Sequence, residues 1–239
     1  YENMQAVVLV GGFGTRLGNI AQDAPKPMVA VCGKPFLEYI ITMLKRKGIT
    51  EFVFCTGHLA HKIKEYFKDG SKFGVSIQYA HENIPLHSAG ALKNAESLLE
   101  DIFFVINGDD YYDTDYKKLF SFHKDKKALC TIATTDINSD IGEIFGNFLK
   151  DEHGKVVEYY DKSRKGNAKN VGIFVLSKDI LRDMPIGMPI SLEKEIIPKY
   201  VKEGRVYAKY DHQRYVMDIG TPKTYKMFIE DVKKGKIRI

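Results

Sequence analysis

A glycine-rich loop directly after a short apolar run places the strongest constraint on the fold of this chain. Residues 6–10 read A-V-V-L-V, and Gly11, Gly12 and Gly14 follow at once. A short apolar run of this kind is typical of a buried parallel strand. Glycine lets the backbone approach a ligand closely, so that several N–H groups can point at one anion. The pattern therefore predicts an α/β fold in which this loop binds phosphate groups.

Two cationic residues follow the glycines and strengthen the prediction of a phosphate site. Arg16 carries a fixed charge with a fork of donors, and Lys26 carries a second positive charge. Pro25 and Pro27 stiffen the backbone on both sides of Lys26, which aims its ammonium group. The alternative is a plain strand-to-helix turn with incidental surface charges. The T-R-L and P-K-P-M segments argue against that alternative.

Two other kinds of glycine loop do not fit this stretch. A P-loop requires G-x-x-x-x-G-K-[ST], but neither Lys-Ser nor Lys-Thr follows these glycines. A dinucleotide fingerprint requires a third glycine three residues after Gly14, where the chain has Leu17. The loop therefore belongs to another class of nucleotide-binding protein.

The segments G-G-F-G-T-R-L and P-K-P-M together resemble the signature of the sugar-1-phosphate nucleotidyltransferases, also called nucleotide-sugar pyrophosphorylases. The resemblance is greatest to guanylyltransferases that act on heptose or mannose 1-phosphates. It implies a Rossmann-like mixed sheet flanked by helices, the GT-A-like fold of that family. It also implies transfer of a nucleoside monophosphate from an NTP to a sugar 1-phosphate, which yields an NDP-sugar for surface-glycan biosynthesis and pyrophosphate.

Composition limits the number of domains and the kind of partner. A chain of 239 residues with 44% hydrophobic content can bury one core, and we expect one domain over residues 4–239. The net charge of +5 suits polyphosphate substrates better than a nucleic-acid surface. No apolar run approaches 18 residues, so we expect no membrane span. No hexapeptide repeat occurs, so we expect no C-terminal β-helix. The oligomeric state stays open.

Cysteine usage bears on compartment and metal chemistry. The three cysteines lie far apart in the sequence, with no C-x-x-C pair: Cys32, Cys55 and Cys130. This arrangement favours reduced thiols in a cytoplasmic protein and argues against a zinc site.

Alternating strand and helix patterns predict a parallel sheet in the nucleotide-binding half, about residues 4–115. Strands are expected at residues 6–10, 51–56, 76–81 and 102–107, and helices at residues 35–47, 59–67 and 88–99. Right-handed crossovers then place the site at the carboxyl ends of the strands. The sugar-phosphate-binding half, about residues 116–239, has expected strands at 128–134, 145–149, 156–160 and 171–176, and helices at 191–201 and 221–233. Thr221 is the expected N-cap of the last helix.

Acidic residues in both halves indicate a metal site. Asp109 and Asp110 end the apolar run 102–107, where hard oxygen ligands would hold Mg²⁺ against a triphosphate. A solvated turn is the alternative, because N-G-D-D is also typical turn sequence. Asp218 lies in D-I-G-T-P, which resembles a family motif, and Thr221 leaves it free of helix capping. By resemblance, Asp109 and Asp218 are the Mg²⁺ ligands and Asp110 is a neighbour.

Base recognition is expected in residues 82–90, which resemble the family pattern [QE]-x-x-P-x-G-[TL]-[AG]. The implied nucleotide contacts are Leu9, Gly11, Gly12, Gly14, Thr15, Glu82, Pro85, His87, Ser88 and Asp109. A carboxylate at Glu82 only accepts hydrogen bonds, which suits the N1–H and N2–H₂ donors of guanine. This favours GTP and leaves CTP and ATP open. His87 replaces the usual glycine, and stacking on the base, narrowing of the pocket and a place on its rim all remain open.

The acceptor side is expected in V-V-E-Y-Y-D-K, residues 156–162, which resembles the family's V-x-x-F-x-E-K. By resemblance Lys162 contacts the sugar phosphate and Asp161 contacts a sugar hydroxyl, although Asp161 is one methylene shorter than the usual glutamate. Gly146 follows an aromatic residue, and Asn170 begins an N-x-G element. These two residues are expected to shape the sugar pocket.

The predicted reaction is an in-line displacement at the α-phosphorus of the nucleotide. Arg16 and the glycine-loop amides would hold the triphosphate, Lys26 the reacting phosphate and Lys162 the acceptor. A metal-dependent glycosyltransferase is one alternative, but it would carry D-x-D and lack the glycine-loop signature. A non-catalytic binding or regulatory module is the other, but it would have lost the charged residues that this sequence retains.

Overall fold

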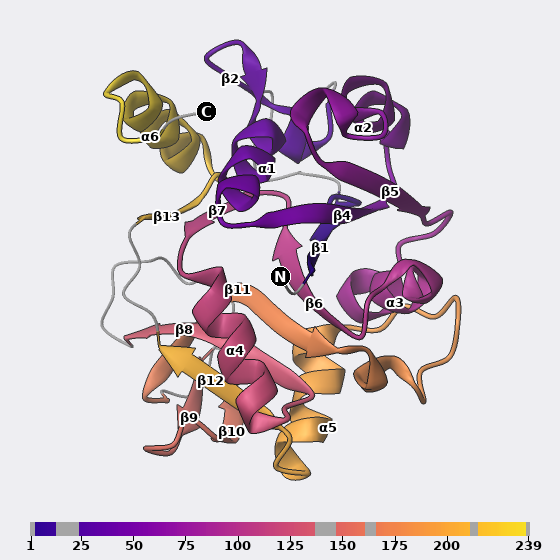
Figure 1. Cartoon of the computed structure of the whole chain (residues 1–239), viewed down its shortest axis with the longest axis vertical. Coiled ribbons are helices and arrows are strands. Elements are labelled where there is room, and N and C mark those ends of the chain that lie inside the picture. The colour runs from indigo at the N-terminus through magenta and orange to yellow at the C-terminus, as the bar shows by residue number, and fades with distance from the viewer. Residues whose placement is uncertain (1–2, 13–23, 137–146, 161–165, 211–214, 238–239) are drawn as a thin grey trace.

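The computed structural model describes residues 3–12, 24–136, 147–160, 166–210 and 215–237, and within them nine strands form one mixed sheet. Helices cover both faces of this sheet (Figure 1). Seven strands follow the order β10-β9-β11-β6-β1-β4-β5, while β8 pairs with β11 and with β12. The expected Rossmann-like mixed sheet flanked by helices is confirmed.

The first half supplies the parallel part of the sheet. Its strands are β1 (Met4–Leu9), β4 (Ile49–Thr56), β5 (Ser76–His81) and β6 (Ile102–Asn107), and neighbouring pairs run parallel. The connecting helices are α1 (Phe36–Arg46), α2 (Ala60–Phe67) and α3 (His87–Asn94), and a 3-10 turn, η4 (Glu96–Leu98), follows α3. Each element lies where the sequence predicts it, except that α3 ends earlier than expected. Gly48 ends the first helix region with a φ of +90°.

Short elements link these larger ones. They are η2 (Lys26–Met28), β2 (Ala30–Val31), β3 (Lys34–Pro35), η3 (Ser71–Phe73) and η5 (Lys178–Leu181). The strands β2 and β3 pair with each other in a small antiparallel ribbon. Together η2 and this ribbon carry the chain from the glycine-loop region into α1.

The second half extends the sheet with β8 (Cys130–Asp136), β9 (Asn147–Lys150), β10 (Val156–Tyr160), β11 (Ala168–Ser177) and β12 (Val206–Tyr210). Because β11 lies antiparallel against β6, one sheet runs through both halves of the chain. The sequence predicts β8 to β11 approximately but misses β12. It also misses helix α4 (Tyr116–Lys126) and strands β7 (Asp110–Asp113) and β13 (Tyr215–Asp218).

The helix expected at residues 191–201 is only partly regular. A π-helical turn, η6 (Leu192–Ile196), precedes α5 (Ile197–Lys202). Pro198 has no amide hydrogen, so it cannot donate the bond that would continue a regular α-helix through this point. The irregular turn places Ser191 and Glu193 beside α3 rather than along a continuous helix.

Alternating side chains of the central strands divide the core into two layers. The residues that face opposite layers are Val8, Phe104 and Ile106 on one side and Val7, Phe103 and Val105 on the other. The first layer packs against α1, α2, α4 and α6, and the second packs against α3 and α5. Burial on both faces explains why these strands are apolar throughout.

The last described element, α6 (Pro222–Lys233), returns to the first half of the molecule (Figure 1). Thr221 caps it as predicted, because its hydroxyl accepts a hydrogen bond from the Thr224 amide at 3.2 Å. Phe228 is fully buried and its ring centroid lies 4.8 Å from that of Phe36. This packing holds β13 next to the carboxyl end of β6. No β-helix occurs in the described residues, and none of their helices could cross a membrane.

Candidate nucleotide and metal site

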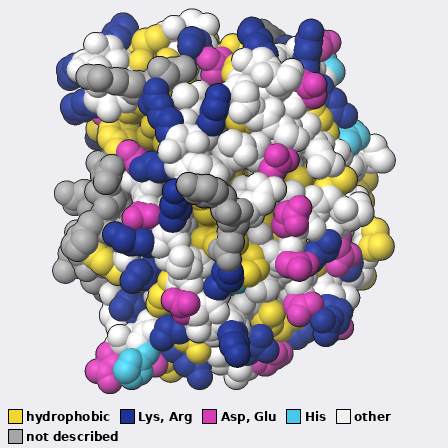
Figure 2. All heavy atoms as spheres, in the orientation of Figure 1, with side chains coloured by type: hydrophobic (Ala, Val, Ile, Leu, Met, Phe, Trp, Pro, Cys, Tyr) yellow, Lys and Arg dark blue, Asp and Glu magenta, His cyan; other side chains and the backbone are white. Residues whose placement is uncertain are grey.

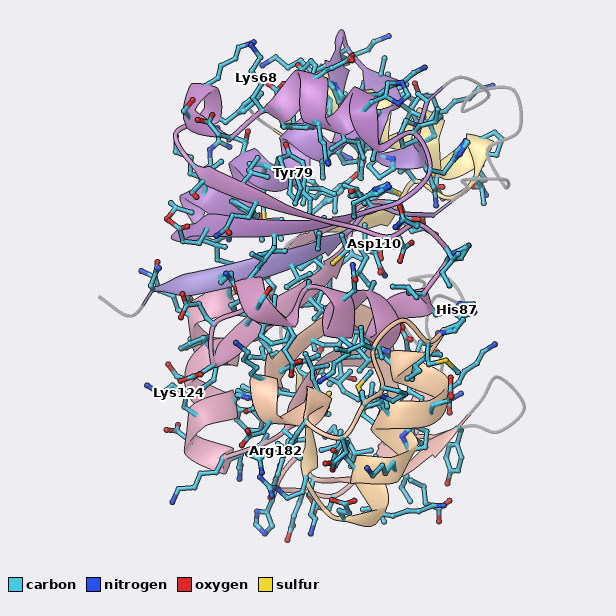
Figure 3. All side chains as sticks on the ribbon, turned by 90° about the vertical axis from the view of Figure 1, so that its right-hand side faces the viewer. Lys68, Tyr79, His87, Asp110, Lys124 and Arg182 are labelled. Atoms are coloured by element: carbon cyan, nitrogen blue, oxygen red, sulfur yellow. The ribbon has the colours of Figure 1, made fainter. Side chains whose placement is uncertain are left out.

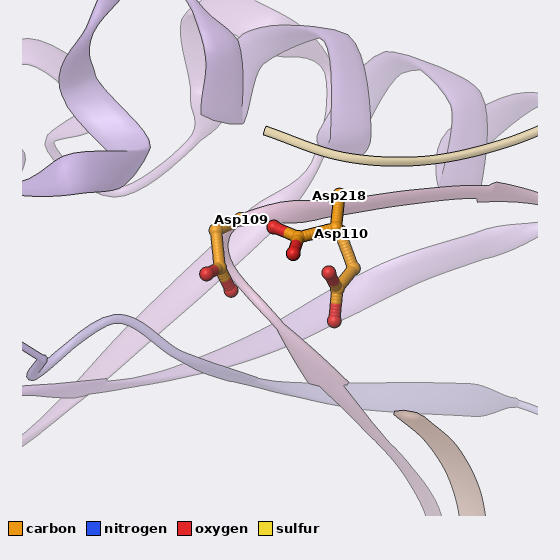
Figure 4. A group of neighbouring side chains, drawn as sticks. All are labelled: Asp109, Asp110 and Asp218. Carbon is orange, nitrogen blue, oxygen red and sulfur yellow. The ribbon is translucent and has the colours of Figure 1, made fainter. Parts of the chain in front are cut away.

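Three carboxylates meet at the carboxyl end of β6, as Figure 4 shows. Asp109 lies in the turn between β6 and β7, and Asp110 pairs in register with Asp218 across the β7–β13 ribbon. The Ile219 amide donates to the Asp109 carbonyl at 3.1 Å and joins the two turns. One ligand oxygen from each carboxylate lies within 4.8 Å of the others. The structure therefore brings together the two predicted ligands, although they lie far apart in sequence.

Two glycines permit this close approach. A Cβ on Gly220 would lie 2.7 Å from an Asp218 carboxylate oxygen, and the Gly220 amide donates to that oxygen at 2.5 Å. A Cβ on Gly108 would lie 2.6 Å from Val10 and 2.9 Å from Pro27. The turns that carry Asp109 and Asp218 thus depend on the absence of a side chain at both positions.

Asp110 contributes a buried carboxylate to the cluster, where the sequence predicted only a neighbour. The residue is 5% exposed, and its carboxylate accepts a hydrogen bond from the side-chain amide of Asn107 at 3.0 Å. Burial, followed by the charges of Asp109 and Asp218, raises the pKa of Asp110 well above its ordinary value. Figure 3 shows Asp110 in the interior of the molecule. The adjacent aspartates in the sequence indicated an acidic site, but they did not show which of the two carboxylates is buried.

Lys26 lies against the same carboxylates. Its ammonium forms an ion pair with Asp109 and lies 3.6 Å from an Asp218 oxygen, and its side chain is 8% exposed. The 3-10 turn η2 holds it in place, with the Met28 amide donating to the Pro25 carbonyl at 2.7 Å. The buried prolines on either side fix this backbone, as the sequence indicated. The sequence did not indicate that Lys26 would pair with the acidic cluster.

The donor set of this cluster fits a divalent cation. Carboxylate oxygens are the hard ligands that Mg²⁺ prefers, and Asp109 and Asp218 remain partly exposed. The cluster is consistent with a divalent metal site.

Glu82 lies against the glycine loop at the carboxyl ends of β1, β4 and β5. A Cβ on Gly11 would lie 2.6 Å from a Glu82 carboxylate oxygen, and a Cβ on Gly57 would lie 3.0 Å from it. The Leu86 amide donates to the other oxygen at 3.3 Å. Burial raises the pKa of Glu82, and the Leu86 amide opposes that shift. The described part of the site thus combines the loop with a half-buried acceptor.

Four further predicted nucleotide contacts lie among the described residues of the first half: Leu9, Gly12, Pro85 and His87. The Leu9 carbonyl accepts the Gly108 amide at 3.0 Å, and no atom of the described residues lies within 4 Å of a Cβ placed on Gly12. Pro85 is exposed, and so is His87, at the edge of the molecule in Figure 3. His87 has a φ of +56°, a conformation that favours glycine, which explains why a glycine would suit this position.

Ser88 and Asn170 make contacts within the protein. The Ser88 hydroxyl accepts the Leu192 amide at 2.8 Å and donates to Glu193 at 3.0 Å. Asn170 is buried on β11, where its amide donates to the Tyr159 hydroxyl at 3.1 Å and its oxygen accepts from Gly172 at 2.8 Å. Glu193 was missed, because nothing in S-L-E-K-E indicates a partner on α3.

Several predicted site residues lie outside the described residues. In the glycine loop they are Gly14, Thr15 and Arg16, and on the acceptor side they are Gly146, Asp161 and Lys162. Their predicted roles remain predictions.

Comparison with known proteins identifies relatives along nearly the whole chain. The sequence model of the family described as "Nucleotidyl transferase" matches residues 5–235. The D-glycero-alpha-D-manno-heptose 1-phosphate guanylyltransferase of Campylobacter jejuni is 35% identical, over 95% of this chain and 99% of that protein. The mannose-1-phosphate guanylyltransferase of Mycobacterium tuberculosis is 31% identical over 98% of this chain, and the match spans 66% of that protein.

A third relative carries a different base in its name, and solved structures share the fold. The UTP–glucose-1-phosphate uridylyltransferase of Synechocystis is 30% identical over 98% of this chain and 65% of its own length. The chain thus spans about two thirds of the length of this uridylyltransferase and of the Mycobacterium tuberculosis guanylyltransferase. HddC from Yersinia pseudotuberculosis, solved in complex with GMP-PN, superposes with a TM-score of 0.82 at 32% identity, over 96% of this chain and 99% of HddC.

Proposed function

Because this chain belongs to the nucleotidyl transferase family and is a sugar-1-phosphate nucleotidyltransferase, we propose that it is a guanylyltransferase that joins GTP to a heptose or hexose 1-phosphate. The products would be a GDP-sugar and pyrophosphate. The observation that carries this proposal is the Glu82 carboxylate, held against Gly11 at the carboxyl ends of the parallel strands. Two guanylyltransferases among the relatives, and the GMP-PN complex of HddC, support the choice of base.

Hydrogen-bond chemistry distinguishes GTP from the pyrimidine nucleotides. A carboxylate at Glu82 can accept from both N1–H and N2–H₂ of guanine, which forms a charge-assisted pair. Uracil offers one N3–H between two carbonyl oxygens, so one oxygen of the carboxylate would face a carbonyl and lack the second donor that guanine supplies. Cytosine keeps one amino donor and is the harder competitor to exclude. The uridylyltransferase among the relatives makes this distinction the first one to test.

The residues of the acidic cluster have a defined role in this proposal. Asp109 and Asp218 would hold Mg²⁺, with Asp110 beside them. A bound cation would supply positive charge that stabilises the reacting phosphate groups. Lys26 lies on two of these carboxylates and would steady the reacting phosphate when substrates are present.

The chemistry asks this chain mainly for positioning. A phosphate oxygen of the sugar 1-phosphate attacks the α-phosphorus of GTP, and the bond to pyrophosphate breaks in line. The glycine-loop amides and Arg16 are proposed to hold the triphosphate and the departing pyrophosphate. The acceptor is already an anion, so the reaction needs neither a covalent nucleophile nor a general base.

The second half is proposed to bind the sugar phosphate. Lys162 would contact its phosphate and Asp161 a sugar hydroxyl, while Gly146 and Asn170 would shape the pocket. Asn170 supports this arrangement from within the fold, because its contacts with Tyr159 and Gly172 fix the irregular part of β11. We also propose the cytoplasm as its compartment, which the free thiols of Cys32, Cys55 and Cys130 support.

Pyrophosphate release from a matrix of substrates tests the proposal. The nucleotides are GTP, ATP, CTP, UTP and dTTP, and the acceptors are mannose, glucose and D-glycero-α-D-manno-heptose 1-phosphates, each with Mg²⁺ and with EDTA. We expect release with GTP and a manno-configured acceptor, and loss of release with EDTA. Release that requires UTP, with any of these acceptors, would contradict the guanylyltransferase assignment. No release with any pair would favour a non-catalytic module.

A further inference from the structure

A segment of the second half lies along the first turn of α3, beside the predicted base-recognition loop. This crossing segment, residues 188–193, runs next to α3 in Figure 1, and Figure 3 shows it close to His87. The Ile190 amide donates to the Leu86 carbonyl at 3.0 Å. The amides of Ala89 and Gly90 donate to the Ile190 carbonyl at 2.9 and 3.1 Å. Residue 190 thus satisfies amides that a helix start normally leaves unpaired.

Among the described residues, no side chain caps the start of α3, so this helix depends on the crossing segment. Gly90 allows the close approach, because a Cβ there would collide with the Met188 carbonyl and lie 3.1 Å from the Leu86 side chain. Any larger residue at position 90 would push the crossing segment away from α3. The glycine in H-S-A-G therefore has a packing reason that does not involve a ligand.

Ser88 completes this junction through its hydroxyl group. It accepts the Leu192 amide at 2.8 Å and donates to the Glu193 carboxylate at 3.0 Å. Ser191 donates to the same carboxylate oxygen at 3.4 Å. Leu192 is fully buried, so its amide would lose its acceptor if the Ser88 hydroxyl turned away. Both of these hydrogen bonds of the Ser88 hydroxyl therefore join it to the crossing segment.

The base-recognition loop is consequently held at both ends. Glu82 is fixed at the sheet, where its amide donates to the Thr56 carbonyl at 2.8 Å. Ser88 is fixed at the crossing segment, and His87 joins the two parts in a left-handed conformation. The Leu86 amide, between these ends, donates to the Glu82 carboxylate. Displacement of the Ser88 end would therefore move a hydrogen bond that orients the Glu82 carboxylate.

We propose that Ser88 and Glu193 are positioning residues for base recognition, which act through the loop that carries Glu82 and not through contact with the nucleotide. This inference rests on the proposed function in one respect, the assignment of Glu82 to the base. It replaces the expectation that the Ser88 side chain binds the nucleotide. It also makes base selectivity, a property of the first half, depend on a residue of the second half.

Steady-state kinetics of three variants test the proposal. Glu193→Ala removes one hydrogen bond of the Ser88 hydroxyl and Ser88→Ala removes two, and each change should raise KM for GTP at least about 10-fold and lower the GTP-over-UTP preference. The values of kcat and of KM for the sugar 1-phosphate should stay within about 2-fold, because the reacting groups are untouched. Ser88→Thr keeps the hydroxyl and should keep the wild-type KM.

The double variant and a matched control complete the design. Ser88→Ala combined with Glu193→Ala should be no worse for KM than Ser88→Ala alone, since Ser88→Ala already removes the contact with Glu193. Glu203→Ala, an exposed glutamate at the end of α5, should leave KM for GTP unchanged. All constants are measured well below the thermal midpoint of each variant.

Two outcomes would overturn the proposal. One is a lowered thermal midpoint with unchanged nucleotide KM and unchanged base preference, which would make the contact purely structural. The other is fully additive effects of the two changes. A wild-type enzyme without preference for GTP would instead refute the assignment of Glu82. The KM of the accepted nucleotide would then still rise in Ser88→Ala if the positioning role holds, and would stay constant if it does not.

Discussion

At the scale of single residues, the main feature is a lysine beside the two carboxylates predicted to hold metal. Lys26 was expected to steady a phosphate, and its backbone setting between two prolines is as the sequence indicated. Its partners could not be predicted, because the ion pair with Asp109 and the approach to Asp218 arise from contacts distant in sequence. The ammonium and a divalent cation are thus alternative counter-charges for the same oxygens.

Replacement of Lys26 by methionine should therefore strengthen binding of a divalent cation in the absence of nucleotide. We expect Mn²⁺ to bind Lys26→Met about 10- to 100-fold more tightly than wild type, since a charged contact worth about 1.5–3 kcal/mol no longer has to be broken. Electron paramagnetic resonance of free Mn²⁺ measures the affinity. Lys34→Met removes a lysine paired with Glu38, away from the cluster, and is the control. Equal affinity in wild type and Lys26→Met would contradict the account.

His87 offers a second test at this scale. Its φ of +56° costs about 1 kcal/mol for a residue with a side chain, and glycine avoids that cost. We expect His87→Gly to raise the free energy of unfolding by up to about 1 kcal/mol, measured with urea. KM for GTP should stay unchanged if His87 lies on the rim. A marked rise in KM would instead favour stacking of His87 on the base.

At the scale of elements, the sequence predicts the strands and helix caps that depend on residues close together in the chain. The central parallel strands β1 and β6 are nearly continuous apolar runs because both faces are buried, and the caps at Gly48 and Thr221 follow from local chemistry. The short strands β7 and β13 were missed, since D-Y-Y-D directly follows a turn and its partner lies more than 100 residues away. Helix α4 was missed because lysines dominate its sequence and only a narrow apolar side faces the core.

The turn between β6 and β7 provides an element-scale prediction. A Cβ on Gly108 would contact Val10, Pro27 and the Leu9 carbonyl, so that Gly108→Ala must displace the turn that carries Asp109. We expect a loss of about 1–3 kcal/mol in the free energy of unfolding, as in other overpacked sites. Gly12→Ala, where the added Cβ would meet no described atom within 4 Å, should cost much less in the same denaturant titration. Similar losses for the two variants would refute this role of Gly108.

At the scale of the whole molecule, one sheet joins the two halves and α6 returns the chain to its starting half. The return of the chain is why Asp218 meets Asp109, a pairing that the sequence indicated only through resemblance to a family. No motif in the sequence indicated the contact between Glu193 and Ser88. Figure 2 shows Lys and Arg side chains interspersed with acidic ones on the face in view, so charge alone does not locate the site there.

The central claim concerns the base, and the ratio of kcat/KM for GTP to that for UTP tests it most directly. We measure this ratio for wild type and for Glu82→Gln with the preferred sugar 1-phosphate. Wild type should prefer GTP by about 10- to 100-fold, since a buried acceptor left unpaired costs about 1–3 kcal/mol. Glu82→Gln should lower the ratio, because an amide can donate to a uracil carbonyl. Equal rates with the two nucleotides in wild type, or a preference unchanged in Glu82→Gln, would contradict the account.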